Sequence, residues 1–497
     1  MLRGVFIQNG IKRKGTFSMT KRIINYYKNL NIGIKVSLWF TFCNFFQKGI
    51  SMLSVPIFTR IMSTEEYGIF SVYQSWYSIL TIIVTLNLFA GVYNKGLVKF
   101  ENKRDEFTAA MLGLSACATA IFFLLYCIDI SMWDKILELK PSYMIIMFAE
   151  MLCVPAYSYW SARQRFEYRY KNLVISTVVM SLLSPLLGIV AVVISENKAF
   201  ARIFSYAFVQ IIFGIIFGVY IIKKCSKLFN KEYWKYALAF NLPLIPHYLS
   251  QIILNQADRI MISRLVGSSE AAIYSVAYNI SLIMSLLTNA INSAFVPSLY
   301  NCLKQKKYSR IKETSTYVLI IAAGVTFIAM LFGPELIQFF APKSYYEAVW
   351  VIPPVALSVY FIAVYALFVN VEFYFEKTKY TMYVSVLGAV LNILLNWIFI
   401  KQYGYIAAGY TTVVCYILFS IGHYILYRYL NKKYLNSISI IKGKIVMSVS
   451  ILLVMLMLFT LVLYNYIWLR YTLIGIIFVG AFIYRQKLIG IIKKIKE

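Results

Sequence analysis

The residues that could do chemistry in this chain are polar side chains set inside long apolar segments. In the segment 36–57, Asn44, Lys48 and Ser51 follow one another at intervals of four and three residues, and Gln47 precedes Lys48. That spacing places them on or beside one face of a helix. Insertion of a charged side chain at the centre of a membrane helix costs about 2.5–3.5 kcal/mol of free energy. A lysine at position 48 therefore indicates a structural or functional role. It either lines a water-filled cavity, which we favour, or caps carbonyl groups of a neighbouring helix.

A second apolar segment, 237–257, repeats this arrangement. It carries Gln251 and Asn255, and Asp258 and Arg259 follow at its outer end. Asp258 and Arg259 form either an ion pair at the membrane interface or a functional group, and the sequence favours neither. Two further segments have polar faces, made of Gln74, Ser78, Thr81 and Thr85 and of Ser281, Ser285, Asn289 and Asn292. Four polar faces, two in each half of the chain, indicate a hydrated central cavity between the halves.

Glu150 is a lone carboxyl group deep in the segment 143–162. It either exchanges a proton during a transport cycle or pairs with a nearby base. We assign Glu150 and Asp258 a coupling or gating role. Whether the coupling ion is H+, Na+ or absent does not follow from the sequence.

Catalysis and cofactor chemistry find little support. The seven cysteines are scattered without a Cys-x-x-Cys pair. The two histidines, His247 and His423, are better explained as hydrogen-bonded packing residues than as metal ligands or proton relays. No phosphate-binding glycine loop or Walker lysine motif is present, which excludes ATP-driven transport within this chain. We therefore predict no catalytic residue, no metal site, no cofactor and no enzymatic activity.

The composition requires a membrane to hold these segments. Of the 497 residues, 60% are hydrophobic and only 14% are charged, whereas a soluble domain has about 25% charged residues. The formal net charge is +29, because 49 lysines and arginines face 20 acidic residues. On a chain this apolar, such basicity more often marks membrane topology than nucleic-acid binding. We predict an all-α polytopic membrane protein that binds no nucleic acid.

Fourteen apolar segments are long enough to cross a bilayer, which takes about 20 residues each. The connections on the N-terminal side hold 38 lysines and arginines, and those on the other side hold 10. By the positive-inside rule the first side is cytoplasmic, so both termini are expected there. The segments are 36–57, 69–91, 109–128, 143–162, 173–194, 203–222, 237–257, 271–296, 316–340, 348–371, 381–400, 406–426, 445–463 and 467–484.

An internal repeat relates the two halves. The stretch Arg60–Val72 aligns without a gap to Arg264–Val276 at an offset of 204 residues, with five identities in thirteen positions. The same offset pairs Gln47 with Gln251. Chance similarity between apolar sequences is the alternative, but a duplication explains the matching flanking segments better. Because each unit has six spans, the halves share one orientation, and their symmetry axis runs along the membrane normal.

These observations divide the chain into five parts. A cytoplasmic tail precedes a six-helix N-lobe, a cytoplasmic linker joins it to a six-helix C-lobe, and two further helices with a short tail end the chain. Met19 could equally be the true start. The parts are 1–35, 36–222, 223–236, 237–426 and 427–497.

Several motifs, taken in order, resemble the polysaccharide (O-antigen or capsule repeat-unit) flippases of the multidrug/oligosaccharidyl-lipid/polysaccharide exporter superfamily. The resemblance extends over essentially the whole chain. It implies a fold like that of the multidrug exporters, with two six-helix lobes in alternating access around a cationic cavity for a lipid-linked pyrophosphoryl sugar. It also implies a groove for the polyprenyl tail, formed by the thirteenth and fourteenth helices. The motifs are Pro56–Phe70, Arg163–Arg169, Asp258–Gly267, Ile273–Tyr278 and Tyr403–Gly409.

The resemblance also implies roles for the polar residues. Lys48 lies at a place comparable to basic residues in the first span of the related lipid II flippases, and it would attract the pyrophosphate. Because those relatives often have more cations there, Arg259 and Arg264 are expected to help. The remaining candidates for substrate binding would hydrogen-bond sugar hydroxyls: Asn44, Gln47, Ser51, Gln251 and Asn255.

The leading hypothesis is a flippase in the bacterial cytoplasmic (inner) membrane. It would move undecaprenyl-pyrophosphate-linked oligosaccharide repeat units from the inner to the outer leaflet. Its expected partners are the lipid-linked oligosaccharide, membrane lipid, a polysaccharide polymerase and a chain-length regulator. One alternative is a multidrug or cation antiporter of the same superfamily, which would favour acids in the cavity. Another is a membrane polysaccharide polymerase or O-acyltransferase, but no outer loop is long and no partner motif accompanies His423.

Overall fold

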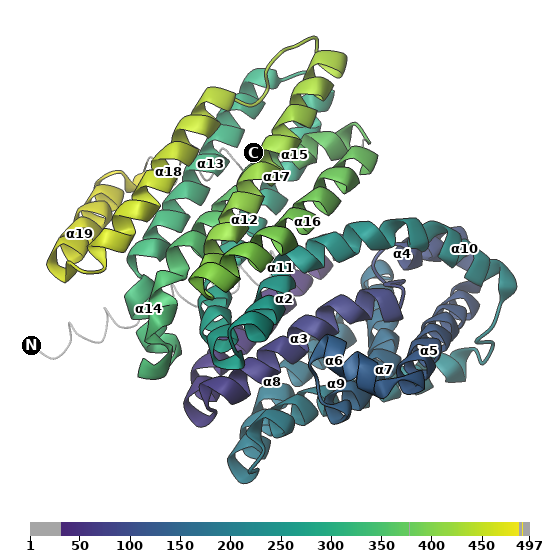
Figure 1. The fold of residues 1–497 in the computed structure, drawn as a ribbon. Coiled ribbons are helices and arrows are strands. Elements are labelled where there is room, and N and C mark those ends of the chain that lie inside the picture. The colour runs from purple at the N-terminus through teal and green to yellow at the C-terminus, as the bar shows by residue number, and fades with distance from the viewer. Residues whose placement is uncertain (1–30, 377, 487–489, 491–497) are drawn as a thin grey trace, which may run out of the picture.

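The chain is helical throughout most of its described length, which comprises residues 31–376, 378–486 and 490 of the computed structural model (Figure 1). No strand occurs in these ranges. The predicted all-α fold class is confirmed. The expectations for residues 1–30, including a start at Met19, concern a segment outside the described residues.

In the part of the chain that the structure describes, eight helices form the first bundle, which is purple to teal in Figure 1. Ser63 begins α3 with a capping box: its Oγ accepts a hydrogen bond from the Glu66 N–H at 3.2 Å, and the Glu66 carboxylate accepts one from the Ser63 N–H at 2.7 Å. This box fixes the point at which the chain turns from one long helix into the next. The helices are α2 (Ile32–Ile61), α3 (Thr64–Val84), α4 (Val92–Lys99), α5 (Arg104–Ile128), α6 (Ile130–Leu137), α7 (Pro141–Phe166), α8 (Tyr170–Ile194) and α9 (Lys198–Lys224).

Ten helices follow among the described residues from Lys231 onwards. The first of them, α10, packs against α4 and α5 of the first bundle. The next seven form the second bundle, and the last two lie along its far side, yellow in Figure 1. They are α10 (Lys231–Asn241), α11 (Ile245–Leu265), α12 (Ser268–Lys304), α13 (Tyr308–Leu331), α14 (Gly333–Phe340), α15 (Ile352–Tyr374), α16 (Thr378–Tyr403), α17 (Ala407–Tyr434), α18 (Gly443–Leu463) and α19 (Ile467–Ile483).

Ten helical stretches among the described residues are long and apolar enough to cross a membrane. The protein is therefore a multi-pass membrane protein. Each of the fourteen predicted segments overlaps a helix, but α2, α3 and α7 are not among the ten, and α19 is a shorter apolar helix. The count of fourteen spans stays a prediction.

Prolines move two of the predicted boundaries. The segment 237–257 begins instead with the end of α10 and a short 3-10 turn containing Pro243, and α11 starts only at Ile245. The prediction of one continuous span over 316–340 is wrong, because Pro334 lies in the first turn of a separate helix, α14. Proline has no N–H to donate, so it suits the first turn of a helix, which is where Pro246 of α11 and Pro334 of α14 lie.

The repeat is visible in the helix boundaries. The helix α2 ends at Ile61 and α11 at Leu265, while α3 begins at Thr64 and α12 at Ser268. Both pairs of boundaries are separated by the offset of 204 residues found in the sequence. The starts of α3 and α12 also lie together, since the hydroxyl oxygens of Thr64 and Ser269 are hydrogen-bonded at 3.1 Å.

The two bundles are joined where α2 ends and α3 begins. There Thr59 Oγ1 donates a hydrogen bond to the Phe340 carbonyl at 2.9 Å, and the rings of Tyr67 and Tyr345 meet edge to face with centroids 6.3 Å apart. One buried apolar cluster continues from the first bundle into the second through this contact. We call it the lobe joint, and define it by Thr59, Thr64, Tyr67, Ser269, Phe340 and Tyr345.

Candidate transport site

The polar face predicted for the first long helix is exposed on α2. Its residues are Asn44, Gln47, Lys48 and Ser51. Exposed apolar residues of the same helix, such as Phe42 and Leu53, lie on a different side, because successive residues turn about 100° around a helix. The first side suits water and a polar ligand, and the second suits lipid.

Lys48 has no ion-pair or hydrogen-bond partner in the part of the chain that the structure describes. Arg60, further along the same helix, is by contrast held by the Pro56 carbonyl at 2.7 Å and the Phe339 carbonyl at 3.2 Å. The explanation of Lys48 as a cap for neighbouring carbonyls therefore has no support among these contacts. Its ammonium group is exposed and free to bind an anion.

Gln251 and Asn255 lie one turn apart on α11. Gln251 is exposed, whereas Asn255 is half-buried and accepts a hydrogen bond from the Tyr278 hydroxyl at 2.8 Å. The Asn255 amide donates to the Gln251 carbonyl at 2.7 Å. Gln251 is therefore available to a ligand, while α12 already holds Asn255 in place.

Asp258 lies in the interior of α11 and not at its outer end, because the helix continues to Leu265. Its carboxylate is buried and accepts three hydrogen bonds, from Tyr274 at 2.5 Å, Asn396 at 2.7 Å and Thr412 at 2.9 Å. These donors belong to α12, α16 and α17, so the carboxylate ties four helices of the second bundle together. Of the two explanations left open for Asp258 and Arg259, an interfacial ion pair finds no support among the described contacts, since Asp258 is satisfied by neutral donors.

Arg259 points towards the first bundle. Its Nη1 donates to Gln256 Oε1 at 2.6 Å, and its guanidinium lies 4.2 Å from the centre of the Tyr278 ring. The same Gln256 oxygen accepts a hydrogen bond from Ser75 of α3 at 3.2 Å. Arg259 is thus buried between the two bundles and engaged there.

Arg264 lies at the end of α11 and forms an ion pair with Glu138 at 2.9 Å. Glu138 belongs to the connection between α6 and α7, so this pair links the two bundles near the lobe joint. The structure therefore divides the predicted substrate-binding residues into two groups. Asn44, Gln47, Lys48, Ser51 and Gln251 are exposed, and Asn255, Arg259 and Arg264 are engaged in contacts.

Glu150 is buried in α7 and accepts a hydrogen bond from the Tyr73 hydroxyl of α3 at 3.1 Å. No basic side chain pairs with it among the described residues, so pairing with a base finds no support. Its contact with α3 places it beside the helix that carries the interface between the bundles.

Buried charged residues that the sequence did not single out include Glu372 and Arg202. His423 Nδ1 lies 2.9 Å from Glu372 Oε1, both side chains are fully buried, and Thr381 donates to the same carboxylate at 2.8 Å. The guanidinium of Arg202 is stacked between Phe58 at 3.8 Å and Phe70 at 4.6 Å. For Glu372, the available signal was a histidine inside one apolar segment, His423, and an acid directly after another, 348–371. Arg202 directly precedes a predicted segment, so its position resembled that of a loop residue.

Comparison with known families shows which family the chain belongs to. The profile of the family described as polysaccharide biosynthesis protein matches residues 34–303, which is more than half of the chain. The chain belongs to this family. A second profile, MatE, matches residues 243–398 of the chain. This confirms the predicted place within the multidrug/oligosaccharidyl-lipid/polysaccharide exporter superfamily.

Relatives of this polysaccharide biosynthesis protein cover most of its length. A Haemophilus influenzae protein of the Lsg locus is 24% identical over 369 residues, which are 70% of this chain and 86% of the relative. A candidate O-antigen transporter of Shigella flexneri is 21% identical over 402 residues, which are 76% of this chain and 93% of the relative.

Solved structures with the same fold are transporters or flippases. The lipid II flippase MurJ, in an inward closed conformation, has a TM-score of 0.66 at 15% identity and covers 92% of this chain and 100% of its own. A multidrug resistance MATE family transporter, in an inward-facing conformation, has a TM-score of 0.60 at 12% identity, with 79% and 96% covered. At this identity the likeness shows the fold alone, which is the predicted MATE-like fold.

Proposed function

We propose that this polysaccharide biosynthesis protein is a flippase for undecaprenyl-pyrophosphate-linked oligosaccharide repeat units. It moves them from the inner to the outer leaflet of the cytoplasmic membrane by alternating access. The observation that carries the proposal is Lys48, an exposed cation in the middle of α2 that is unpaired among the described residues, on a face with amide and hydroxyl groups. A charge in such a place is costly unless a function retains it.

The binding chemistry follows from the exposed residues. A pyrophosphate carries negative charge and accepts hydrogen bonds, so it suits the ammonium group of Lys48. Sugar hydroxyls both donate and accept, so they suit the amides of Asn44, Gln47 and Gln251 and the hydroxyl of Ser51. Arg259 joins the site only if its contacts with Gln256 and Tyr278 open when the bundles move.

The movement itself is the opening of the lobe joint. In the described conformation, the hydrogen bonds and the edge-to-face rings of the joint hold the bundles together at one end, while the polar face of α2 is exposed. We place the joint on the outer side, following the distribution of basic residues, with both termini in the cytoplasm. Release of the joint would expose the binding face to the opposite leaflet.

Glu150 and Asp258 are the proposed coupling groups. Each is a buried carboxyl without a cationic partner among the described residues, and each contacts a helix that lies between the bundles. Gain or loss of a proton or a small cation at either group would change the hydrogen bonds that position α3 and α11. The proposal includes no catalytic step, and a polymerase and a chain-length regulator would act on the delivered repeat units.

The test replaces Lys48→Ala and Lys48→Arg in a strain that depends on the protein for surface polysaccharide. Lys48→Ala should abolish surface polysaccharide and accumulate single lipid-linked repeat units in the inner leaflet, with normal protein levels. Lys48→Arg should retain part of the activity, because it keeps the charge. Lys401→Ala, which removes a cation from the end of α16, is the control and should change neither measurement.

Normal polysaccharide in the Lys48→Ala strain would overturn the site. Single units in the outer leaflet of a strain without the protein would point to a polymerase instead. Loss of resistance to cationic dyes without any change in polysaccharide would point to a multidrug antiporter.

A further inference from the structure

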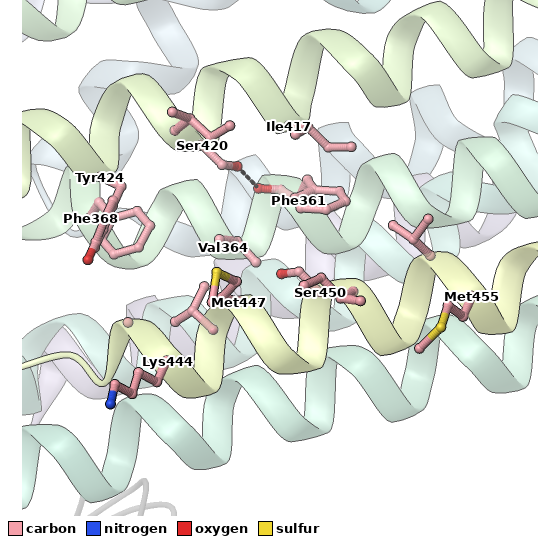
Figure 2. Close-up of a pocket in the computed structure, with 15 residues that line it drawn as sticks. Phe361, Val364, Phe368, Ile417, Ser420, Tyr424, Lys444, Met447, Ser450 and Met455 are labelled. Atoms are coloured by element: carbon pink, nitrogen blue, oxygen red, sulfur yellow. Dashed lines mark hydrogen bonds between the residues drawn. The ribbon is translucent and has the colours of Figure 1, made fainter.

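An apolar groove runs along α18, away from the polar face of α2 and from the lobe joint. It lies between α15, α17 and α18 and encloses about 660 Å³ (Figure 2). Two serines line it, but Ser420 donates to the Phe361 carbonyl at 3.2 Å and Ser450 is hydrogen-bonded to the Tyr360 hydroxyl at 3.0 Å. Because these hydroxyls are already satisfied, the groove offers hydrocarbon surface to an occupant.

The length of the groove matches one leaflet of a bilayer. Figure 2 shows Lys444 at one end of the lining residues and Met455 at the other, both on α18. Eleven residues of helix correspond to about 16 Å. The hydrocarbon core of a bilayer is about 30 Å thick, so one leaflet measures about 15 Å. An acyl chain of a bilayer lipid therefore fits the groove from end to end.

A polar pocket of about 530 Å³ continues from the Lys444 end. Tyr424, Gly443 and Lys444 line both the groove and this pocket, so the two spaces are contiguous. Arg428 and Lys432 add two more cations to the pocket. Its wall also includes the following polar residues: Asn431, Ser437 and Ser439.

The cations around the pocket are not neutralised within the described part of the chain. Residues 428–444 contain five lysines and arginines and no acidic residue. None of the five forms an ion pair with another described residue. In addition, Asn431 is 8% exposed and its Oδ1 is buried without a hydrogen-bond donor among the described residues. A headgroup with a phosphate and a hydroxyl would satisfy both features.

We propose that the groove and the pocket together bind an anionic glycerophospholipid of the surrounding membrane. The phosphate lies near Arg428, Lys432 and Lys444, and one acyl chain follows α18 along the groove. Such a lipid would stabilise the packing of α18 against the second bundle. A bilayer lipid fits better than the transported lipid, because the groove has the depth of one leaflet and the site is separate from the polar face of α2.

Positive charge in this region also serves membrane topology. Lys433 distinguishes a role of the cations in topology from a role in lipid binding. It lies in the same stretch and is exposed, but it does not line the pocket. A topology signal depends on all these cations alike, whereas a lipid site depends only on those that line the pocket.

The experiment titrates delipidated, purified full-length protein with phosphatidylglycerol and with phosphatidylcholine, and counts bound lipids by native mass spectrometry. The double variant Arg428→Gln/Lys444→Gln should bind phosphatidylglycerol about 25-fold more weakly, since each cation near an anionic lipid contributes about a fivefold factor. Lys433→Gln should bind it like the unchanged protein. Met447→Trp, which fills the groove without a change in charge, should also weaken binding.

Three results would overturn the proposal. The first is equal binding by the double variant and Lys433→Gln, and the second is equal affinity for phosphatidylglycerol and phosphatidylcholine. The third is tighter binding of undecaprenyl phosphate than of phosphatidylglycerol, lost in the same variants, which would assign the site to the transported lipid. Since Lys48 is unchanged in all three variants, failure here leaves the proposed transport site untouched.

Discussion

Gly68 of α3 lies directly against the backbone carbonyl of Ser268 in α12. A Cβ atom added at Gly68 would stand far inside contact distance of that oxygen, and a backbone group cannot move aside as a side chain can. The close approach brings together the N-terminal ends of two helices that the repeat makes equivalent. Glycine at this position therefore sets how closely the two bundles can approach at the lobe joint.

Gly68→Ala should weaken the lobe joint by an amount on the order of 1–3 kcal/mol, the usual cost of overpacking. The measurement is disulfide cross-linking between Thr64→Cys and Ser269→Cys, whose native hydroxyl oxygens are 3.1 Å apart, and it should become slower in the variant. Gly324→Ala is the matched control. A Cβ at that position in α13 meets nothing within 4 Å, so cross-linking should not change. Equal rates in both variants would contradict the role of Gly68.

Asp258→Asn should destabilise the second bundle by about 3 kcal/mol. The new amide keeps one acceptor oxygen where three donors converge, and hydrogen bonds to a charged group contribute about 1.5–3 kcal/mol each. Thermal unfolding of the purified protein measures the loss. Glu101→Gln is the control, because its carboxylate pairs with Arg104 at an exposed site and such pairs contribute about 0–1 kcal/mol. An unchanged melting temperature in Asp258→Asn would refute the structural role of this carboxylate.

Glu150→Gln should abolish the coupling of transport to protons without a loss of thermal stability. The variant keeps an acceptor for the Tyr73 hydroxyl, so the melting temperature should stay near that of the unchanged protein. Transport should lose its response to an imposed proton gradient, because a side-chain amide does not gain or lose a proton as a carboxyl group does. Tyr73→Phe provides the comparison: it removes one hydrogen bond, worth about 1 kcal/mol, and keeps the carboxyl group. Full gradient dependence in Glu150→Gln would exclude Glu150 as the coupling group.

Reversal of one charge in the Arg264–Glu138 pair should disturb the approach of the bundles more than the stability of either. Both side chains are about half exposed, so loss of the attraction costs only about 0–1 kcal/mol. Glu138→Arg should nevertheless slow cross-linking at the lobe joint by placing two cations together. The double reversal Glu138→Arg/Arg264→Glu should restore the rate. No rescue by the double variant would mean that the pair does not contribute to the joint.

The sequence predicted what depends on local spacing. The intervals between Asn44, Lys48 and Ser51 placed these residues on one helix face, and the structure exposes that face on α2. The offset of the repeat reappears in the boundaries at Ile61 and Leu265. Helix periodicity and helix ends are local properties, so one chain without any three-dimensional information is enough to find them.

Contacts between distant segments could not be read in the same way. For the carboxylate of Asp258, an ion pair with its neighbour Arg259 was one of the two explanations that the sequence left open. Its actual donors include Asn396 and Thr412, which follow it by 138 and 154 residues and come from other helices. Adjacent residues on a helix point about 100° apart. Sequence proximity therefore says little about which groups meet, and the partnership of Glu372 with His423 was missed for the same reason.

The aromatic packing of the lobe joint has a thermal consequence. Phe58, Tyr67, Tyr274, Phe340 and Tyr345 are all buried in the cluster that spans the two bundles. Separation of the bundles would wet these rings, and the hydrophobic free energy that opposes wetting becomes smaller on cooling. Cold should therefore favour the arrangement in which the bundles are separated. The lifetime of the conformation described here should accordingly depend on the temperature of the membrane.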